Sequence, residues 1–247
     1  MLGEWTWTPV GPHVADLYRP AGQSGAPVFG LIFLHGVGGE SLRGQEPFTR
    51  VLDELNWPCL CPWGGQTWWT DRLLPEYHAE QSAESYLLHD VLDFCREHWR
   101  LAPPRLALAG ISMGGQGALR LGFKRPETFP VVGGIAPAIE YHQLMDADGP
   151  LDRLYTSPEQ CRQDTVPMHV QPQQFPAHIG FWCDPDDALW HRGNDRLHEK
   201  LAALGVPHEC DLTTRAGGHD WTFFGAMAQP LLHFLHRGLV EQSRRLL

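Results

Sequence analysis

The chain has 247 residues, 43% of them hydrophobic, which is enough apolar material for one large core. Its formal net charge is −10, and no cluster of basic residues interrupts the acidic balance. A chain of this charge disfavours nucleic acid and anionic membrane surfaces as partners. The sequence leaves the oligomeric state open.

The first residues and the cysteines bear on the cellular compartment. Residues 1–8 contain neither a basic n-region nor an apolar h-region, so we expect no signal peptide there. No apolar run is long enough to span a bilayer. Without a secretion signal, the six cysteines are expected to be reduced, and Cys59-x-Cys61 lacks the spacing of a zinc or redox motif. We therefore expect a cytoplasmic protein.

The hydrophobic pattern predicts an alternation of strands and helices. The predicted strands are Glu4–Thr8, Val14–Tyr18, Val28–Leu34, Trp57–Cys61, Arg105–Ala109, Val131–Ile135, Ile179–Cys183 and His208–Thr213. The predicted helices are Glu46–Leu55, Glu80–His98, Gly114–Lys124, Trp190–Leu204 and Phe223–Leu239. After the first two strands the two types alternate, which is typical of a mostly parallel, eight-stranded sheet with helices on both faces. We expect residues 1–247 to form a single α/β domain.

Two stretches match no regular element. Residues 62–77 form a long tryptophan-rich loop, and residues 140–176 are polar and contain prolines. Both follow the carboxyl ends of predicted strands, where ligands bind in open α/β sheets. Both are therefore candidate substrate walls, and a mobile surface excursion is an equal alternative for residues 140–176.

The sequence Gly-Ile-Ser-Met-Gly at residues 110–114 follows an apolar strand and precedes a helical pattern. A G-x-S-x-G motif in that context is the nucleophile elbow of α/β-hydrolases. Its two glycines permit a turn that is too tight for side chains, and the turn exposes the serine hydroxyl at a helix N-terminus. Ser112 is thus the candidate nucleophile.

A serine hydroxyl needs a histidine base, and the histidine needs a carboxylate that fixes its tautomer. In α/β-hydrolases the carboxylate and then the histidine follow the serine along the chain. His219 follows the last predicted strand and two glycines, as such a base should. Three aspartates after the strand 179–183 are candidates for the acid: Asp187, a few residues past the strand end, is the first choice, Asp186 the second and Asp184 the third. The two that are not the acid are expected to cap the loop by hydrogen bonds to backbone amides.

The tetrahedral intermediate of acyl transfer needs backbone N–H groups directed at its negative charge. One should come from Met113, the residue after the nucleophile. Another should come from the His-Gly-Val-Gly-Gly loop at residues 35–39, where we expect Val37, together with Gly36, to point into the site. His35 itself is expected to hydrogen-bond the loop backbone rather than to act in catalysis.

Several segments together resemble the esterase D branch of the α/β-hydrolases. Residues 112–119 match its S-M-G-G-x-G-A-L elbow, and residues 183–189 and 217–221 resemble the acid and histidine segments of its feruloyl-esterase-like members. The branch also includes S-formylglutathione hydrolases, acetyl-xylan type esterases and mycolyltransferases. The resemblance implies an α/β-hydrolase fold and a serine esterase, and it supports Asp187 and His219. Gln116 stands where formylglutathione hydrolases usually have histidine, which disfavours a glutathione thioester.

Aromatic residues give the hints about substrate. Trp63 and Trp68 in the tryptophan-rich loop, and Trp221 after the candidate base, could stack on a sugar or an aromatic acyl group. Packing of the loop is the alternative for Trp63 and Trp68. The pair His233-x-x-His236 has no third ligand nearby in the sequence, so we expect neither a metal site nor a cofactor.

We expect a serine hydrolase that cleaves a carboxylic ester through an acyl-enzyme on Ser112. An acyltransferase or an acyl-thioesterase would use the same triad and remains an alternative. A non-catalytic binding module of the same fold would lack a triad member, and candidates for all three members are present here.

Overall fold

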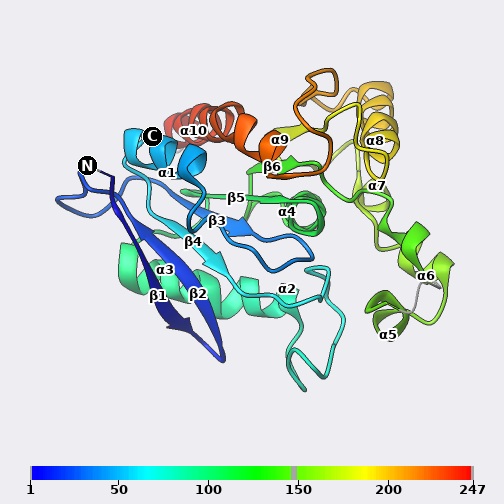
Figure 1. The fold of residues 1–247 in the computed structure, drawn as a ribbon, viewed down its shortest axis with the longest axis horizontal. Coiled ribbons are helices and arrows are strands. Elements are labelled where there is room, and N and C mark those ends of the chain that lie inside the picture. The colour runs from blue at the N-terminus through cyan, green and yellow to red at the C-terminus, as the bar shows by residue number, and fades with distance from the viewer. Residues whose placement is uncertain (1, 146–148, 246–247) are drawn as a thin grey trace.

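The computed structural model describes residues 2–145 and 149–245, and its centre is an eight-stranded sheet (Figure 1). The strand order is β1-β2-β4-β3-β5-β6-β7-β8. The strands are β1 (Glu4–Val10), β2 (His13–Arg19), β3 (Gly30–Leu34), β4 (Cys59–Pro62), β5 (Leu106–Ile111), β6 (Val131–Ile135), β7 (His178–Trp182) and β8 (Glu209–Asp211). The pairs β1–β2 and β2–β4 are antiparallel, and all the other pairs are parallel. The predicted mostly parallel sheet is confirmed.

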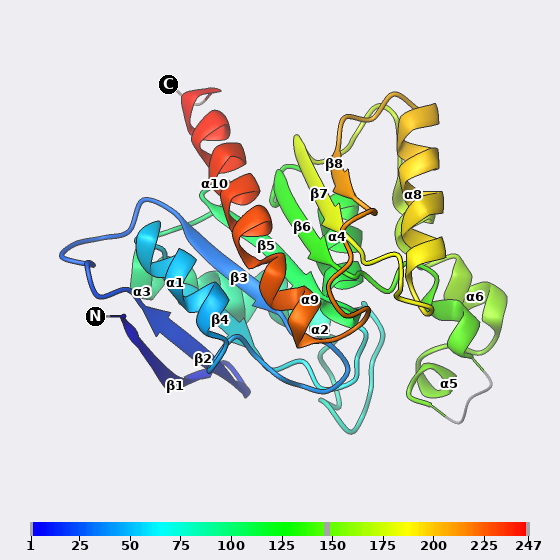
Figure 2. The same cartoon turned by 45° about the horizontal axis from the view of Figure 1, so that its top comes forward.

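Helices cover both faces of the sheet, as predicted. They are α1 (Glu46–Glu54), α2 (Ala83–Tyr86), the π-helix η1 (Leu87–Val91), α3 (Leu92–Trp99), α4 (Met113–Lys124), the 3₁₀-helix η2 (Tyr141–Leu144), α5 (Leu151–Leu154), α6 (Pro158–Arg162), α7 (Val166–His169), α8 (His191–Ala203), α9 (Trp221–Ala226) and α10 (Ala228–Arg245). α1, α9 and α10 lie on one face, and α2, α3 and α4 lie on the other (Figures 1 and 2). Among the described helices, none combines the length and the apolar character needed to cross a membrane.

The central strands are buried on both faces, which fixes where the core lies. Every residue of β3, β5 and β6 is buried. α10 packs so closely on β6 that a Cβ added to Gly133 would lie 2.4 Å from Cδ1 of Leu231. Such complete burial is typical of parallel strands covered by helices. It gives the carboxyl ends of β3, β5 and β7 a rigid base on which loops can carry a site.

Two predicted helices differ in detail from the observed ones. The predicted helix 80–98 begins only at Ala83, because Ser82 Oγ accepts a hydrogen bond from the Ser85 amide and caps it. Its middle contains the π-helical turn η1. The predicted helix 223–239 begins earlier, at Trp221, because the Asp220 carboxylate accepts hydrogen bonds from two amides of its first turn, and it is divided at Met227.

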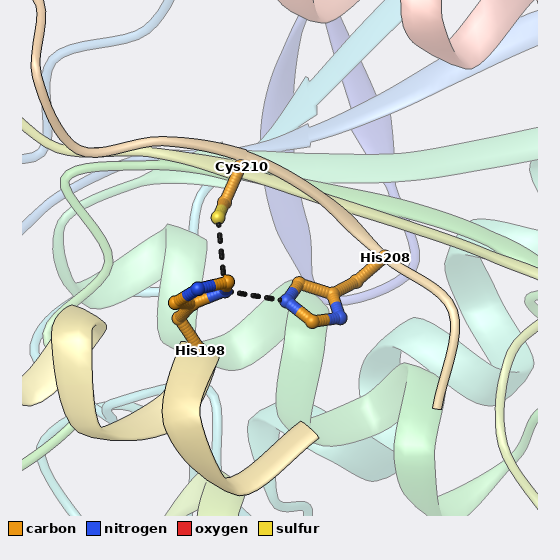
Figure 3. Close-up of side chains that lie close together, drawn as sticks. All are labelled: His198, His208 and Cys210. Atoms are coloured by element: carbon orange, nitrogen blue, oxygen red, sulfur yellow. Dashed lines mark hydrogen bonds between the residues drawn. The ribbon is translucent and has the colours of Figure 1, made fainter. Parts of the chain in front are cut away.

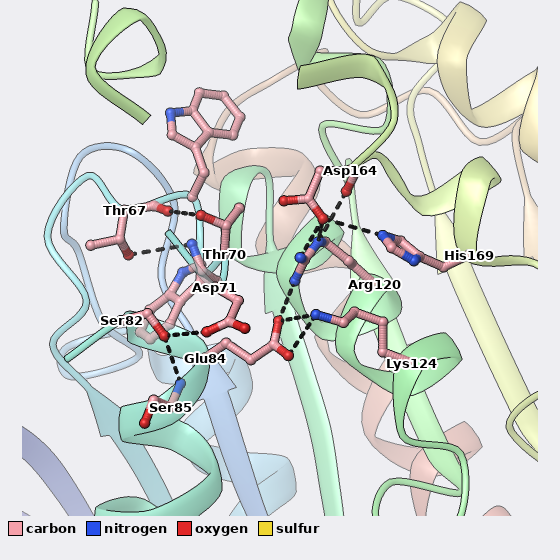
Figure 4. Close-up of polar contacts among 12 residues, drawn as sticks. Thr67, Thr70, Asp71, Ser82, Glu84, Ser85, Arg120, Lys124, Asp164 and His169 are labelled. Carbon is pink, nitrogen blue, oxygen red and sulfur yellow. Dashed lines mark hydrogen bonds and ion pairs between the residues drawn. The ribbon is translucent and has the colours of Figure 1, made fainter. Parts of the chain in front are cut away.

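The excursion at residues 140–176 is anchored to α4 by buried charges (Figure 4). The Arg120 side chain on α4 is only 1% exposed and forms ion pairs with Glu84 and Asp164. Lys124 pairs with the same Glu84 at 2.6 Å. Burial would lower the pKa of Arg120, but the charges of Asp164 and Glu84 outweigh it and raise that pKa, so the guanidinium is charged. In its described residues the excursion thus carries four short helices that are tied to the helix behind Ser112.

Candidate active site

Ser112 lies in a sharp turn between β5 and α4. Its backbone has φ 51° and ψ −119°, a conformation that residues other than glycine rarely adopt. A Cβ added to Gly114 would lie 2.0 Å from the Leu34 carbonyl oxygen, and one added to Gly110 would lie 2.5 Å from the same oxygen. The two glycines of the motif are therefore required by the close approach of β3 and its loop to the turn.

The turn is held on its other side by the segment after β6. The Ser112 amide donates to the Ile135 carbonyl at 2.9 Å, and the Ala138 amide donates to the Ser112 carbonyl at 3.1 Å. Both backbone groups of the strained residue are thereby satisfied by hydrogen bonds. The side chain alone is free to face the pocket described below.

His219 reaches Ser112 from the loop between β8 and α9. Its Nε2 lies 3.0 Å from Ser112 Oγ, and its Nδ1 lies 2.7 Å from Asp187 Oδ2. Gly217 and Gly218 before it have φ of 110° and 77°, which favour glycine. The structure therefore brings together the three residues that the sequence indicates, from loops that follow β5, β7 and β8.

The side chain of Asp187 is buried and held by four donors. Oδ1 accepts hydrogen bonds from the Leu189 and Trp190 amides, each at 3.0 Å. Oδ2 faces the His219 ring, and the Cys183 thiol lies 3.6 Å away from it. Burial raises the pKa of Asp187, but these hydrogen bonds and the charge of His219 outweigh it, so the pKa is lowered and the carboxylate is ionised.

The two competing aspartates have other contacts. Asp186 is exposed and forms an ion pair with Arg215. Asp184 is buried, and its Oδ2 accepts hydrogen bonds from the Ala216 amide at 2.6 Å and the Gly218 amide at 2.9 Å. Asp184 thus braces the loops as predicted, whereas the Asp186 carboxylate pairs with Arg215 instead of capping the loop. Of the three aspartates, only Asp187 contacts the His219 ring in the described residues.

Gly36 and Val37 lie beside Ser112, which directly precedes α4. Both line the pocket, and a Cβ added to Gly36 would lie 3.4 Å from the Ser112 Cβ. Met113 is the first residue of α4, so its N–H has no acceptor within the helix. The loop of Gly36 and the N-terminus of α4 thus both lie next to Ser112, where the positive end of the helix dipole favours an anion.

His35 is buried and shapes this loop, as predicted. Its Nδ1 lies 2.6 Å from the Gly36 carbonyl, and its Nε2 accepts a hydrogen bond from the Gly64 amide at 2.9 Å. Acceptance at Nε2 places the proton on Nδ1, which donates to Gly36. Burial lowers the pKa of His35 and keeps the ring neutral. The Trp69 indole donates to the His35 carbonyl at 3.1 Å, which ties the tryptophan-rich loop to the same place.

A pocket of about 300 Å³ opens over Ser112. It is lined by Gly36, Val37, Gly38, Glu40, Ile111, Ser112, His219, Asp220, Trp221 and Phe224. The Trp221 indole donates to Glu40 Oε2 at 2.5 Å across the mouth of the pocket. The ring of Phe224 meets the ring of His219 edge-on, with centroids 5.2 Å apart. Glu40 and Phe224 were missed by sequence reasoning, although Phe224 could have been found as a neighbour of Trp221 on the same short helix.

The other two predicted tryptophans lie outside this lining. Trp63 is 41% exposed, and its ring packs at 5.8 Å from those of His13 and Tyr77. Trp68 is buried and stacks on Tyr141 of the excursion at 4.9 Å. The proposed contact with substrate stays a prediction for all three tryptophans, of which Trp221 lines the pocket.

Comparisons with solved structures define the class of the fold. An S-formylglutathione hydrolase from Agrobacterium tumefaciens superposes with a TM-score of 0.79 at 16% identity, over 96% of this chain and 94% of that one. The fluorophosphonate-binding serine hydrolase F of Staphylococcus aureus superposes with a TM-score of 0.74 at 16% identity, over 95% of this chain and 99% of that one. A ferulic acid esterase from Anaeromyces mucronatus superposes with a TM-score of 0.66 at 17% identity, over 97% of this chain and 92% of that one. The fold is that of the α/β-hydrolases.

A match to a family model makes the assignment more specific. The model of the Esterase family, described as "Putative esterase", matches residues 58–233, which is more than half of the chain. The chain therefore belongs to this esterase family and is a carboxylic ester hydrolase of the serine type. No curated protein matches the chain.

Proposed function

We propose that the protein hydrolyses a small-molecule carboxylic ester through an acyl-enzyme on Ser112. Ser112 Oγ attacks the acyl carbon while its proton passes to His219 Nε2. The Asp187 carboxylate accepts a hydrogen bond from His219 Nδ1–H and stabilises the imidazolium that forms. His219 then protonates the departing alcohol oxygen, and the acyl group stays on Ser112. Water, deprotonated by the same nitrogen, attacks the acyl-enzyme; the bond from the acyl carbon to Ser112 Oγ breaks, His219 returns the proton to Oγ, and the acid is released.

The single observation that carries this proposal is the continuous chain of hydrogen bonds at the floor of the pocket. Its two links are 3.0 Å from Ser112 Oγ to His219 Nε2 and 2.7 Å from His219 Nδ1 to Asp187 Oδ2. Each lies within the range needed for proton transfer between heavy atoms. A structural role alone does not require a hydroxyl, an imidazole and an ionised carboxylate in this order beside a pocket.

We assign the oxyanion hole to the amides of Met113 and Val37, with Gly36 shaping the approach. The support is the place of Val37 beside Ser112 in the pocket lining, and the orphan N–H of Met113 at the first position of α4. Preorganised N–H groups of this kind contribute about 2.7–4 kcal/mol each to transition-state stabilisation. They act on the negative charge that develops on the carbonyl oxygen during attack.

The pocket also bounds the substrate. A volume of about 300 Å³ and the aromatic rings of Trp221 and Phe224 favour a small ester with an apolar or aromatic portion. We place the excursion at residues 140–176 in the same single domain, as an outer wall of the substrate region. Its support is the stacking of Tyr141 on Trp68, because the neighbouring Trp69 is bonded to the loop of Gly36.

We also propose that the protein acts in the cytoplasm, without nucleic acid or membrane partners. All six cysteines lie in the described residues as free thiols, which suits a reducing compartment. The net charge of −10 is unfavourable for binding polyanions or anionic lipid. The proposed reaction needs no cofactor, because the triad supplies both nucleophile and proton transfer.

The test is labelling with a fluorophosphonate probe, which reacts with activated serines. We expect the wild type to be labelled at Ser112, with labelling and ester hydrolysis lost in Ser112→Ala. Ser24→Ala, a change of an exposed serine, is the matched control and should behave as wild type. Equal labelling or turnover in Ser112→Ala would sink the proposal. A panel of p-nitrophenyl, feruloyl, acetyl-sugar and acyl-thioester substrates, with and without an added alcohol acceptor, then separates hydrolysis from acyl transfer.

A further inference from the structure

Three side chains with metal-binding atoms meet between α8 and the edge strand β8 (Figure 3). His198 lies on α8, Cys210 lies in β8 and His208 comes directly before β8. His198 Nδ1 is 2.8 Å from His208 Nε2 and 3.3 Å from Cys210 Sγ. One donor atom from each residue lies within 4.8 Å of the others. None of the three residues takes part in the proposed ester hydrolysis.

The His208 ring is held so that one nitrogen faces the cluster. Its Nδ1 lies 2.9 Å from the Val206 carbonyl, an acceptor, so Nδ1 carries the proton and donates it. Nε2 therefore presents its lone pair toward His198 and Cys210. The ring also stacks on Phe181 with centroids 5.8 Å apart and planes at 6°. A backbone carbonyl that fixes the tautomer in this way is the usual support of a metal-binding histidine.

Two of the three donor separations lie near those of a small tetrahedral ion, and the third, between His208 Nε2 and Cys210 Sγ, is within 4.8 Å. With Zn–N bonds of about 2.05 Å and a Zn–S bond of about 2.3 Å, tetrahedral angles separate two nitrogens by roughly 3.3 Å and nitrogen from sulfur by roughly 3.6 Å. The observed separations of 2.8 and 3.3 Å are each shorter by a few tenths of an ångström. Rotation of the side chains by a small amount would admit the ion.

We propose that His198, His208 and Cys210 bind a Zn²⁺ ion through His198 Nδ1, His208 Nε2 and Cys210 Sγ. Two imidazoles and one thiolate form a donor set that favours zinc over the oxygen-seeking Mg²⁺ and Ca²⁺. Binding displaces the thiol proton of Cys210 to solvent, and the sulfur lone pair forms the Zn–S bond. His198 Nδ1 donates to His208 Nε2 in the metal-free protein, so it also gives up its proton on binding, and the His198 ring takes a proton at Nε2 and stays neutral. Three protein ligands leave the fourth position to water, because the cluster is only partly buried.

The consequence of the site is a clamp between two elements that carry the proposed triad. α8 follows the loop of Asp187, and β8 leads into the loop of His219. β8 has only three residues and lies at the edge of the sheet, so an ion that joins it to α8 would add to its stability. The clamp would act on the supports of the triad without touching the reacting atoms.

The test uses Co²⁺ as a spectroscopic substitute for Zn²⁺, added to the metal-free chain of residues 1–247. We expect one equivalent to bind, with the visible bands of tetrahedral cobalt and a thiolate-to-cobalt charge-transfer band, and Zn²⁺ to displace it. Zn²⁺ should raise Tm and protect Cys210 from a thiol reagent. The other five cysteines are buried, so Cys210 should dominate the labelling.

Two site variants and one matched control decide the outcome. Cys210→Ser should abolish the charge-transfer band, and His208→Gln should weaken cobalt binding by at least about 10-fold. His233→Gln, a change of a partly buried histidine on a helix outside the cluster, should bind as wild type. Ester hydrolysis and circular dichroism of the metal-free variants confirm that they fold. Absence of the thiolate band in wild type, or its persistence in Cys210→Ser, would overturn the zinc site and leave the proposed hydrolysis intact.

Discussion

Asp184 accepts a hydrogen bond from the Gly218 amide at 2.9 Å, and this bond joins the end of β7 to the loop that carries His219. The same carboxylate accepts from the amides of Ala216 and Asp186, at 2.6 and 2.7 Å. One buried side chain thus fixes the chain immediately before two of the proposed triad members. The relative position of Asp187 and His219 depends on a residue that contacts neither reacting atom.

Asp184→Ala is therefore expected to lower both stability and activity. Each buried amide left without an acceptor costs about 1–3 kcal/mol, so the midpoint of urea unfolding should fall clearly. Burial raises the pKa of Asp184, but the hydrogen bonds from the three amides outweigh burial, and the pKa lies below its usual value. The ionised Asp184 carboxylate therefore stabilises the fold fully above its unfolded-state pKa, and this stabilisation is lost as the pH falls through its folded-state pKa. In unfolding titrations the gap between wild type and Asp184→Ala should narrow at acid pH, and a pH-independent gap would contradict this role.

Asp187→Asn and Asp186→Asn should differ sharply in kcat. Asp187 Oδ2 faces His219 Nδ1 at 2.7 Å, so an amide there favours the wrong tautomer and should reduce kcat by about 10⁴-fold. Asp186 is exposed and paired with Arg215, and its change should leave kcat within a few-fold of wild type. Steady-state kinetics on p-nitrophenyl acetate measures both. A large loss in Asp186→Asn with a small one in Asp187→Asn would reverse the assignment.

Gly114→Ala should destabilise the elbow. The added Cβ would lie 2.0 Å from the Leu34 carbonyl oxygen, which is backbone and cannot rotate away. Overpacking of this kind costs typically about 1–3 kcal/mol or more, and movement of Ser112 should also reduce fluorophosphonate labelling. Gly25→Ala is the control, since a Cβ there meets nothing within 4 Å. Thermal unfolding compares the two variants, and an unchanged Tm in Gly114→Ala would refute the close approach.

The sequence predicts well the strands that show as local apolar runs and the site residues that belong to a motif. The strand 131–135 is predicted to the residue, because its apolar run is bounded by turn residues. β5 extends two residues further than predicted, because Gly110 and Ile111 still pair with Leu34 and Ile135, although the motif suggests a turn there. The spatial meeting of Ser112, Asp187 and His219 agrees with the order of the motifs. Their catalytic roles remain predictions until the variants are measured.

The rest depends on contacts between residues far apart in the sequence. Arg120 looks like an ordinary charged helix residue, yet its partners Glu84 and Asp164 lie 36 and 44 residues away. The helices of the excursion have four or five residues, too few for a hydrophobic period to appear. His198 and Cys210 are separated by a helix end and a turn, so no short metal motif signals their proximity.

Arg120→Met tests the buried ion pairs that anchor the excursion. Removal of the guanidinium leaves the buried Glu84 and the partly buried Asp164 with fewer partners, which should cost about 3–5 kcal/mol in the free energy of unfolding. Arg96→Met removes an exposed ion pair with Asp93 and should change stability by about 1 kcal/mol or less. Urea unfolding of the two variants gives the comparison. Equal stabilities would show that the buried charges do not anchor the excursion.

Trp221→Ala and Trp221→Phe separate two roles of one residue at the pocket mouth. The indole lines the pocket and donates to Glu40 Oε2 at 2.5 Å. If its ring stacks on the substrate, Trp221→Ala should raise KM for an aromatic ester by about 10-fold, which corresponds to about 1.4 kcal/mol, with little change in kcat. Trp221→Phe keeps a ring and loses the hydrogen bond, so it should recover most of the KM. A rise in KM of equal size in both variants would instead assign the effect to the Glu40 contact, since only that contact is missing from both.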